Sequence, residues 1–551
     1  MYHRSSPGKV TPQAPPTVER ATLPASVGGM NSLNSLMGMP AEDCLYTHNL
    51  MPSEYGLRLR KGYREWASGL GASVNTIIGF EGQKEDGSSA RMWAVTPNGI
   101  YNVSLYNTTA PVQDVPGAGP VGTDPWTNLS GQAGYGVYCE TSNDANKRFL
   151  FYADGENGLF MYDETLDVWS VPAITATVPE DFDVTKVAFV TTWKNRLWFV
   201  MQDSGDGWYL PPDAIAGTVE KFVFGSKFIK GGDLRCLYSW TIDGGAGMDD
   251  YLIAVSHGGD VLVYAGVDPA TIDFKMTGSF YIGEAPDSRR LGVDHGSELY
   301  LLSVSGLTSV RELLQGAPVE TIQGVGPAAK ISRFLRQDVK EGKIYPQWDL
   351  IVNPSEGFLQ IIAPYTQGAS AIQYTQNLQT QAWGMWKGVP VNSAGVWNDE
   401  YFIGDEFGSV WINDAGRDGT TLADGGGNPI EYDILTSFQV PGGDHSNYKR
   451  VGLIRTIGVL AGNSNYNIKP VYDYDISAVV PTPVSLPSQD LSLWDTALWD
   501  EAIWGESVTG ASLITGGSGM GRAVALAMKG SSDTRFTLVG WDVTFTQGGF
   551  L

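Results

Sequence analysis

The chain has 551 residues, a formal net charge of −24 and a sequence pI near 4.5. A grip on DNA phosphates needs clustered Lys and Arg, so the charge argues against a protein that binds nucleic acid tightly on its own. With 68 Gly, 30 Pro, 11% aromatic and only 17% charged residues, the composition favours many short strands joined by turns. We therefore expect an all-β protein of several folding units.

The cysteines and the N-terminus exclude several classes of protein. Cys44, Cys139 and Cys236 are far apart and form no C-x-x-C pattern, so we expect neither a disulfide framework nor a zinc site, and a reducing cytoplasm suits them. The first residues contain no apolar core, and no apolar run reaches 18 residues. Neither a secretion signal nor a membrane span is therefore predicted.

Residues 1–75 are assigned to an N-terminal arm and platform segment. Residues 1 to about 27 are rich in Pro, Ser and Thr and have no hydrophobic periodicity, which is typical of an extended arm that orders on a partner.

From about residue 91 onward, one unit recurs: an apolar run, a polar turn ending in glycine, and a second apolar run with aromatics. Each unit is typical of a β-hairpin. The turn glycines are Gly99, Gly158, Gly207, Gly259, Gly306, Gly357 and Gly408. Their successive spacings are 59, 49, 52, 47, 51 and 51 residues, close to the repeat of about 50 residues in kelch-like propellers.

These repeats predict a central β-propeller of six or seven blades over residues 76–420. A single small sheet cannot bury its faces alone, whereas blades packed around an axis bury a continuous core. The sixth unit is the weakest, because Pro354 interrupts its turn and a Gln/Thr-rich stretch, 373–381, follows it. A pair of β-sandwiches is the alternative, and helices through the middle third would contradict the propeller.

Residues 421–551 are predicted to form a separate platform domain. The breaker Gly425-Gly-Gly-Asn-Pro429 precedes longer alternating strands such as 453–459, 522–528 and 536–545. We expect a β-sandwich-like domain that packs back on the N-terminal segment.

No residue is assigned a catalytic, cofactor-binding or metal-binding role, and the chain is not predicted to be an enzyme. The five histidines form no H-E-x-x-H motif, and there is no nucleophile elbow and no phosphate-binding loop. The 60 acidic residues make some glycosidase-like carboxylate pair inevitable, so no acid can be nominated without geometry. A polysaccharide-degrading propeller stays the enzymatic alternative.

Two sets of aromatic residues are candidate contacts with a partner or host. Trp494, Trp499 and Trp504 are spaced five apart, which suits either a stacking platform or a wedge that packs the C-terminal domain. Trp208 and Tyr209 follow a hairpin turn, and they would contact the host if the chain were a receptor-binding protein.

The densest basic patch consists of Arg58, Arg60, Lys61 and Arg64. Strand alternation places Arg58 and Arg60 on one face, opposite the leucines at 57 and 59. The patch is either an ordinary half-buried strand or a subunit interface that faces an acidic neighbour.

Short motifs near both ends of the chain carry a family resemblance. Met39-Pro40, Asn49-Leu-Met-Pro52 and Arg60-Lys-Gly-Tyr63 occur in that order, and Trp494-Asp, Trp499-Asp and Gly519-Met-Gly-Arg-Ala-Val-Ala525 follow near the end. Together they resemble the tail nozzle, or tail hub, proteins of short-tailed bacteriophages. The polar extension before residue 28 and the lack of an aromatic in 49–52 depart from that family.

The resemblance implies a structural virion protein that is assembled in the host cytoplasm. Six copies would form a ring below the portal and the adaptor, with attachment points for tail fibres or tailspikes and for a needle or plug. The double-stranded genome would pass through the ring without sequence-specific binding. An acidic wall would let DNA pass, so we expect an acidic lumen.

Overall fold

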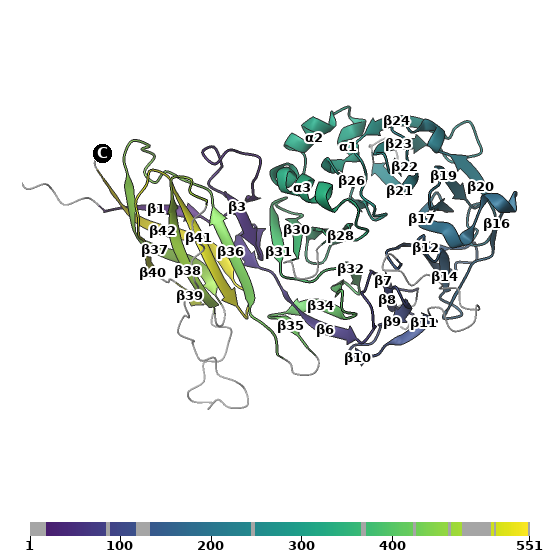
Figure 1. Cartoon of the computed structure of the whole chain (residues 1–551), viewed down its shortest axis with the longest axis horizontal. Coiled ribbons are helices and arrows are strands. Elements are labelled where there is room, and N and C mark those ends of the chain that lie inside the picture. Colours follow the sequence, from purple (N-terminus) through teal and green to yellow (C-terminus); the bar gives the residue numbers. More distant parts are fainter. Residues whose placement is uncertain are drawn as a thin grey trace, which may run out of the picture.

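The computed structural model describes residues 18–83, 89–116, 133–243, 248–364, 371–421, 426–460, 464–476, 509–511 and 514–548. It contains a ring of small sheets and, beside it, a two-layer β body (Figure 1). We call the two bodies the propeller and the platform. The prediction of an all-β protein with a central propeller is confirmed.

Seven antiparallel blades surround one axis in the part of the chain that the structure describes. Blade one comprises β7 (Thr76–Phe80), β8 (Arg91–Thr96), β9 (Gly99–Asn102) and β11 (Val112–Pro116), and blade two comprises β12 (Val137–Ser142), β13 (Arg148–Ala153), β14 (Leu159–Asp163) and β15 (Val168–Ser170). Blade three comprises β17 (Val187–Trp193), β18 (Arg196–Met201), β19 (Asp206–Tyr209) and β20 (Gly217–Val223). Blade four comprises β21 (Leu234–Asp243), β22 (Met248–Ser256), β23 (Asp260–Ala265) and β24 (Lys275–Tyr281).

Blades five to seven follow in chain order. Blade five comprises β25 (Gly292–His295), β26 (Glu298–Ser303) and β27 (Gly306–Ser309), and blade six comprises β28 (Asp349–Asn353), β29 (Phe358–Ile362), β30 (Ile372–Asn377) and β31 (Trp383–Lys387). Blade seven comprises β32 (Ser393–Trp397), β33 (Glu400–Gly404) and β34 (Val410–Ala415), together with β6 (Gly62–Ser68) from before blade one. The first strand of each blade faces the axis, and several neighbouring first strands contact each other, as β12 and β17 do.

Every predicted hairpin is present. Six of the seven turn glycines have positive φ, for example Gly99 at 141° and Gly408 at 87°, which explains why glycine marks the repeat. Gly207 instead lies within β19. The sixth hairpin, at Gly357, joins the first two strands of its blade, whereas the others join the second and third.

Ring closure corrects the predicted domain boundary. Strand β6 lies inside the segment 1–75 that we assigned to the arm and platform, yet it pairs with β34 and completes blade seven. An open propeller would leave an unpaired edge on its last blade, and a strand from before the first blade removes that edge. The propeller therefore begins at residue 62.

Blade five has three strands followed by helices that the sequence analysis did not predict. They are α1 (Val310–Leu314), α2 (Val319–Val325) and α3 (Ser332–Gly342). Ser309 caps α1 by accepting a hydrogen bond from the Glu312 amide, so Ser309-Val-Arg-Glu312 was an overlooked capping signal. Among the described residues the α-helices are confined to 310–342 and so do not run through the middle third, and the other blades contain strands and only short 3₁₀ turns such as Pro179–Asp181.

The platform consists of two sheets built from both ends of the chain. The outer sheet contains β1 (Val18–Pro24), β4 (Leu50–Ser53), β5 (Gly56–Leu59), β37 (Lys449–Leu460), β39 (Thr509–Ala511), β40 (Ile514–Gly516) and β42 (Thr537–Gln547). The inner sheet contains β2 (Gly29–Met30), β3 (Asp43–His48), β36 (Ile430–Thr436), β38 (Ser464–Tyr472) and β41 (Val524–Ser532). The predicted packing of the C-terminal region on the N-terminal segment is confirmed.

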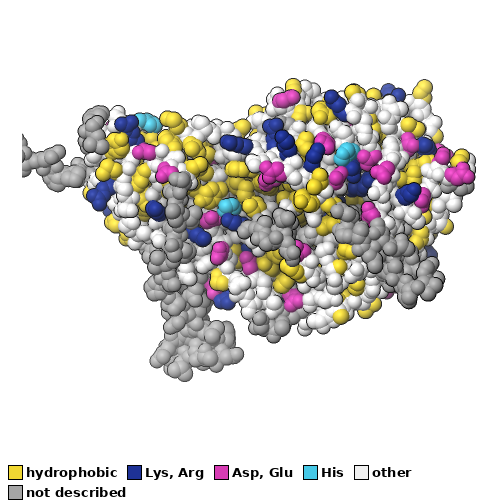
Figure 2. Space-filling model, viewed as in Figure 1, with side chains coloured by type: hydrophobic (Ala, Val, Ile, Leu, Met, Phe, Trp, Pro, Cys, Tyr) yellow, Lys and Arg dark blue, Asp and Glu magenta, His cyan; other side chains and the backbone are white. Residues whose placement is uncertain are grey.

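The inner sheet continues into blade six, because β3 bridges to β31 at His48 and Met385. Short strands β10 (Thr108–Thr109), β16 (Ile174–Ala176) and β35 (Asp418–Thr420) extend the blades. One hydrophobic core runs from the platform, including Trp541, to blade six, including Trp383. The platform and the propeller are therefore joined directly to each other (Figure 2).

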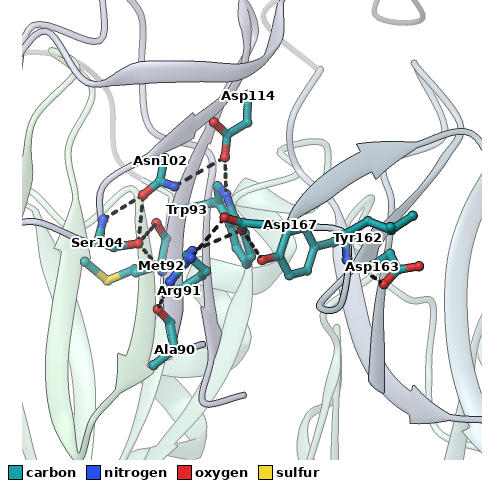
Figure 3. Close-up of polar contacts among 11 residues, drawn as sticks. Ala90, Arg91, Met92, Trp93, Asn102, Ser104, Asp114, Tyr162, Asp163 and Asp167 are labelled. Carbon is teal, nitrogen blue, oxygen red and sulfur yellow. Dashed lines mark hydrogen bonds and ion pairs between the residues drawn. The ribbon is translucent and has the colours of Figure 1, made fainter. Parts of the chain in front are cut away.

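Neighbouring blades pack through aromatic side chains. Trp93 on β8 is fully buried, and its ring centroid lies 4.7 Å from that of Tyr162 and 5.1 Å from that of Trp169, both in blade two. At the rim, Arg91 forms an ion pair with Asp167, with 3.1 Å between Nη2 and Oδ2, and the Tyr162 hydroxyl donates to Asp167 at 2.5 Å (Figure 3).

We expect the aromatic core, not the rim ion pair, to hold the first two blades together. Trp93→Ala should lower the free energy of unfolding by about 3–5 kcal/mol, because it leaves a large cavity. Arg91→Ala should cost less than about 1 kcal/mol, because Asp167 is 58% exposed and solvent screens the pair. Urea unfolding followed by tryptophan fluorescence measures both. Equal losses would contradict this ranking.

Candidate functional site

The predicted basic patch lies where the platform meets the propeller. The Arg60 side chain is 1% exposed and makes a bidentate ion pair with Asp418, with nitrogen–oxygen distances of 2.7 and 2.6 Å. Its guanidinium also lies 5.8 Å from the centre of the Trp386 ring in blade six. Arg60 therefore serves an internal contact.

Two other members of the patch are also paired within the chain, and one is not. Lys61 pairs with Glu356 in the turn of blade six. Arg64 makes two hydrogen bonds of 2.8 and 2.7 Å to Asp414 in β34. Arg58 alone is exposed and has no ion pair with a described residue. The prediction that strand alternation places Arg58 and Arg60 on one face is wrong: Arg58 is exposed and Arg60 is buried, because β5 ends at residue 59.

Asn49 is the residue at this junction that sequence reasoning missed. Its Nδ2 donates to the carbonyl oxygens of Lys387 in blade six, at 2.9 Å, and Glu431 in the platform, at 2.7 Å. Its Oδ1 accepts from Arg60 Nε at 2.9 Å. Its φ of 64° favours Asn, whose short side chain tolerates the left-handed region. We call Asn49, Arg60 and Asp418 the junction cluster.

The motif residues next to the junction cluster are equally constrained. A Cβ on Gly62 would lie 2.2 Å from the carbonyl oxygen of Arg417, so only glycine fits there. A cavity of about 350 Å³ next to the cluster is lined by His48, Tyr63 and Asp433 among others, and His48 Nδ1 lies 2.5 Å from Asp433 Oδ1. These contacts link the two bodies.

The aromatic contacts predicted for a host do not lie on the surface. Trp208 is 3% and Tyr209 is 4% exposed. Trp208 packs on Phe182, and Tyr209 packs on Trp198 and donates to Glu220 at 2.6 Å. Burial raises the pKa of Tyr209, and its hydrogen bond to Glu220 adds to the shift. Their assignment as exposed contacts is wrong, because both side chains are part of hydrophobic core clusters.

Trp494, Trp499 and Trp504 lie outside the described residues.

The propeller axis contains a cavity of about 290 Å³ lined by residues from all seven first strands. Its ionisable side chains include Arg289, Arg290 and Asp349. Asp349 Oδ2 lies 3.1 Å from Arg290 Nη1. Burial nevertheless raises the pKa of Asp349 to about 6, because the charged form loses more in hydration than it recovers from one ion pair. We call this space the axial cavity.

The solvent-facing side of the outer platform sheet carries arginines without ion pairs. Arg20 on β1 and Arg450 and Arg455 on β37 are exposed, and none has an acidic partner within 4.0 Å among the described residues. Arg455 lies opposite Asp542 on β42, and Arg20 lies opposite Thr544. Leu453 is 49%, Ile514 58% and Val539 45% exposed nearby. We call this surface the arginine face.

The described residues contain no helix long and apolar enough to cross a membrane. They also contain no group of three His, Cys, Asp or Glu residues placed to hold a metal ion. All three cysteines are free thiols, and burial raises the pKa of Cys236 to about 12.

No family model and no curated protein matches the chain. Among solved structures it is similar to the extracellular domain of a putative hybrid two-component system from B. thetaiotaomicron, with TM-score 0.37, 10% identity and coverage of 75% of this chain but only 44% of that one. It is also similar to YCF48 bound to D1 peptide, with TM-score 0.34, 11% identity and coverage of 66% and 97%, and to BBS1N in complex with ARL6DN, with TM-score 0.32, 9% identity and coverage of 64% and 97%. Similarity at this level carries no inference about function.

We expect the junction cluster to stabilise the whole chain. Arg60→Met removes the cation from a buried ion pair and should lower the free energy of unfolding by about 3 kcal/mol, because Asp418 and Asn49 lose their donor. Arg58→Met, two residues earlier and exposed, is the matched control and should change stability by less than about 0.5 kcal/mol. Chemical unfolding of both variants measures the two stability changes, and equal changes would refute the cluster's role.

The axial carboxyl should make stability depend on pH. The folded pKa of Asp349 is about 6 and its unfolded value is near 3.8, so the folded state binds the proton more tightly. Its carboxylate therefore destabilises the fold fully above about pH 6, and this cost disappears as the pH falls toward 4. The thermal stability of the wild type relative to Asp349→Asn should rise between pH 7 and 5. A flat difference for Asp349→Asn would contradict the assignment.

Proposed function

We propose that the chain is the subunit of a ring-shaped tail nozzle of a short-tailed bacteriophage, located below the portal and adaptor. The double-stranded genome passes through the ring during ejection, and other tail parts attach to it. In this role the protein forms part of a channel of fixed shape through which DNA moves. No side chain of this chain is assigned a chemical step.

The observation that carries the proposal is the position of the motifs that resemble the nozzle family. Asn49, Arg60 and Gly62, which belong to the N-terminal motifs, form or flank the junction cluster. Gly521 and the strand that follows it belong to the C-terminal motif, and they pack in the platform against Tyr472. Motifs from both ends thus maintain one rigid arrangement of two bodies, which suits a subunit that must keep its shape while DNA moves past it.

The distribution of charge supports assembly into a ring. Residues 62–421 contain 43 acidic and 23 basic residues, so the propeller carries most of the net charge of −24. The arginine face lies on the platform, at the other body. A ring of identical chains needs two different surfaces that complement each other, and an arginine face against a neighbour's acidic propeller meets that requirement. This face replaces the patch at residues 58–64 as our proposed subunit interface.

The apolar side chains of the arginine face strengthen this assignment. Leu453 and Ile514 lie beside Arg455, because both β40 and β42 pair with β37 there. Protein interfaces are enriched in Arg, and their fully buried core is more apolar than the rest of the surface. Solvent-exposed arginines without partners lose little on transfer to an acidic partner surface.

The proposal predicts charge-dependent rings. Purified full-length chain, alone and with the adaptor, should give a multimeric mass by light scattering and rings with a central hole by electron microscopy. Raising NaCl from 0.05 to about 0.5 M should weaken assembly, because salt screens exposed charges. Arg450→Glu/Arg455→Glu should shift the preparation to monomers, and Arg333→Glu/Lys340→Glu on the exposed side of α3 is the control with equal charge change.

Three outcomes separate the parts of this proposal. A monomer under every condition, adaptor included, would contradict the nozzle. Rings that persist in the Arg450→Glu/Arg455→Glu variant would exclude the arginine face but not the nozzle. A ring whose mapped lumen is lined mainly by Lys and Arg would contradict the passage of DNA along an acidic wall.

A further inference from the structure

Arg289 is a buried cation without a counter-ion. It lies between β24 and β25, is 9% exposed and donates one hydrogen bond, from Nη1 to the carbonyl oxygen of Arg235 at 2.9 Å. No carboxylate of the described residues lies within 4.0 Å of its guanidinium. Removing an arginine from water without an anionic partner costs several kcal/mol in general, so proteins rarely leave one in this state.

The surroundings of Arg289 add to this cost. Arg235 repels it, and the two acids whose charge favours it, Asp233 and Asp203, do not offset its burial; Asp233 is itself engaged by Arg235 at 3.4 Å. Burial and the neighbouring charge of Arg235 lower the pKa of Arg289 to about 10. The cation is therefore held where the chain itself supplies too little negative charge.

A second arginine lies beside it in the axial cavity. Arg290 Nη1 contacts Asp349 Oδ2 at 3.1 Å and the Asn75 carbonyl oxygen at 3.2 Å, and its Nη2 is buried without a partner. Both arginines line the axial cavity, in which Asp349 is the only carboxylate among the lining residues. Two arginines and one acid, which is paired with Arg290, thus line a space of about 290 Å³.

We propose that the axial cavity binds one small oxyanion, which is held by the Arg289 guanidinium with Arg290 as a second positive charge. The planar guanidinium fork matches the paired oxygens of a phosphate or a carboxylate. The anion supplies the negative charge that the fold lacks and so ties together the first strands that surround the axis. This site is independent of ring assembly.

The site belongs to the axial cavity and not to the neighbouring mouth pocket. Arg289 also lines a pocket of about 280 Å³ that contains Asp154, Glu156 and Asp287. Three acids against Arg235 and Arg289 make that pocket unfavourable for an anion. Charge therefore directs the ligand to the axial side of Arg289.

The experiment measures the response of the full chain to two oxyanions. Inorganic phosphate and acetate are added at constant ionic strength, adjusted with chloride, and both the melting temperature and the heat of binding are recorded. We expect one anion per chain and a rise in melting temperature of about 1–3 °C at saturation for at least one of them. The two arms distinguish a phosphate from a carboxylate ligand.

Variants of Arg289 test whether the anion binds at this residue. Arg289→Met should abolish the anion response and be no less stable than wild type in chloride alone, because it removes an unpaired buried charge. Arg289→Lys, which keeps the charge but loses the fork, should bind about tenfold more weakly. The exposed Arg333→Met should respond as the wild type does. The proposal fails if neither anion binds to the wild type, or if Arg289→Met responds equally.

Discussion

Closure of the propeller ring is the constraint on which the rest of the structure depends. The fourth strand of blade seven, β6, comes from before blade one, so the chain enters and leaves the propeller at the same blade. Both ends of the chain must therefore emerge on one side, where they build the platform together. This explains why β1 pairs with β42 and β3 with β36, although more than 380 residues separate each pair.

Closure also determines where the polar residues are needed. The segment between β5 and β6 crosses from platform to propeller. Arg60 donates to the Lys61 carbonyl oxygen in this segment, and Asp418, just after blade seven, neutralises Arg60. Asn49 accepts from Arg60 and donates to carbonyl oxygens of both bodies. A buried ion pair adds little net stability compared with an apolar contact, but it specifies one arrangement, since any shift leaves a buried charge unpaired.

The sequence predicted the parts of the fold that repeat and missed those that depend on neighbours. Turn glycines with positive φ revealed the hairpins because glycine adopts that conformation without the steric cost of a Cβ. The Gln/Thr-rich stretch looked like an interruption, yet it forms β30, where Gln373 is fully buried and accepts from the Ala363 amide at 2.6 Å. Such pairing across strands leaves no local signal, and neither does the burial of Trp208 between strands.

The same limit applied to the candidate site. The basic patch at residues 58–64 was visible, but its partners Glu356, Asp414 and Asp418 lie about 300 residues or more away in the chain. Local sequence shows a charge, and only the fold shows whether that charge is already paired. The unpaired arginines at Arg20, Arg450 and Arg455 carried no special spacing and were therefore overlooked.

In so acidic a chain, the role of an arginine depends on whether it already has an acidic partner. With 60 acidic against 36 basic residues, a cation that lacks a partner does so because of its position and not because acids are scarce. Where such a cation is exposed, as on the arginine face, water satisfies it, and we propose that an acidic neighbour replaces this water on assembly. Where it is largely buried, as Arg289 is, hydration is incomplete, and we propose that a small oxyanion at the axis supplies the missing charge.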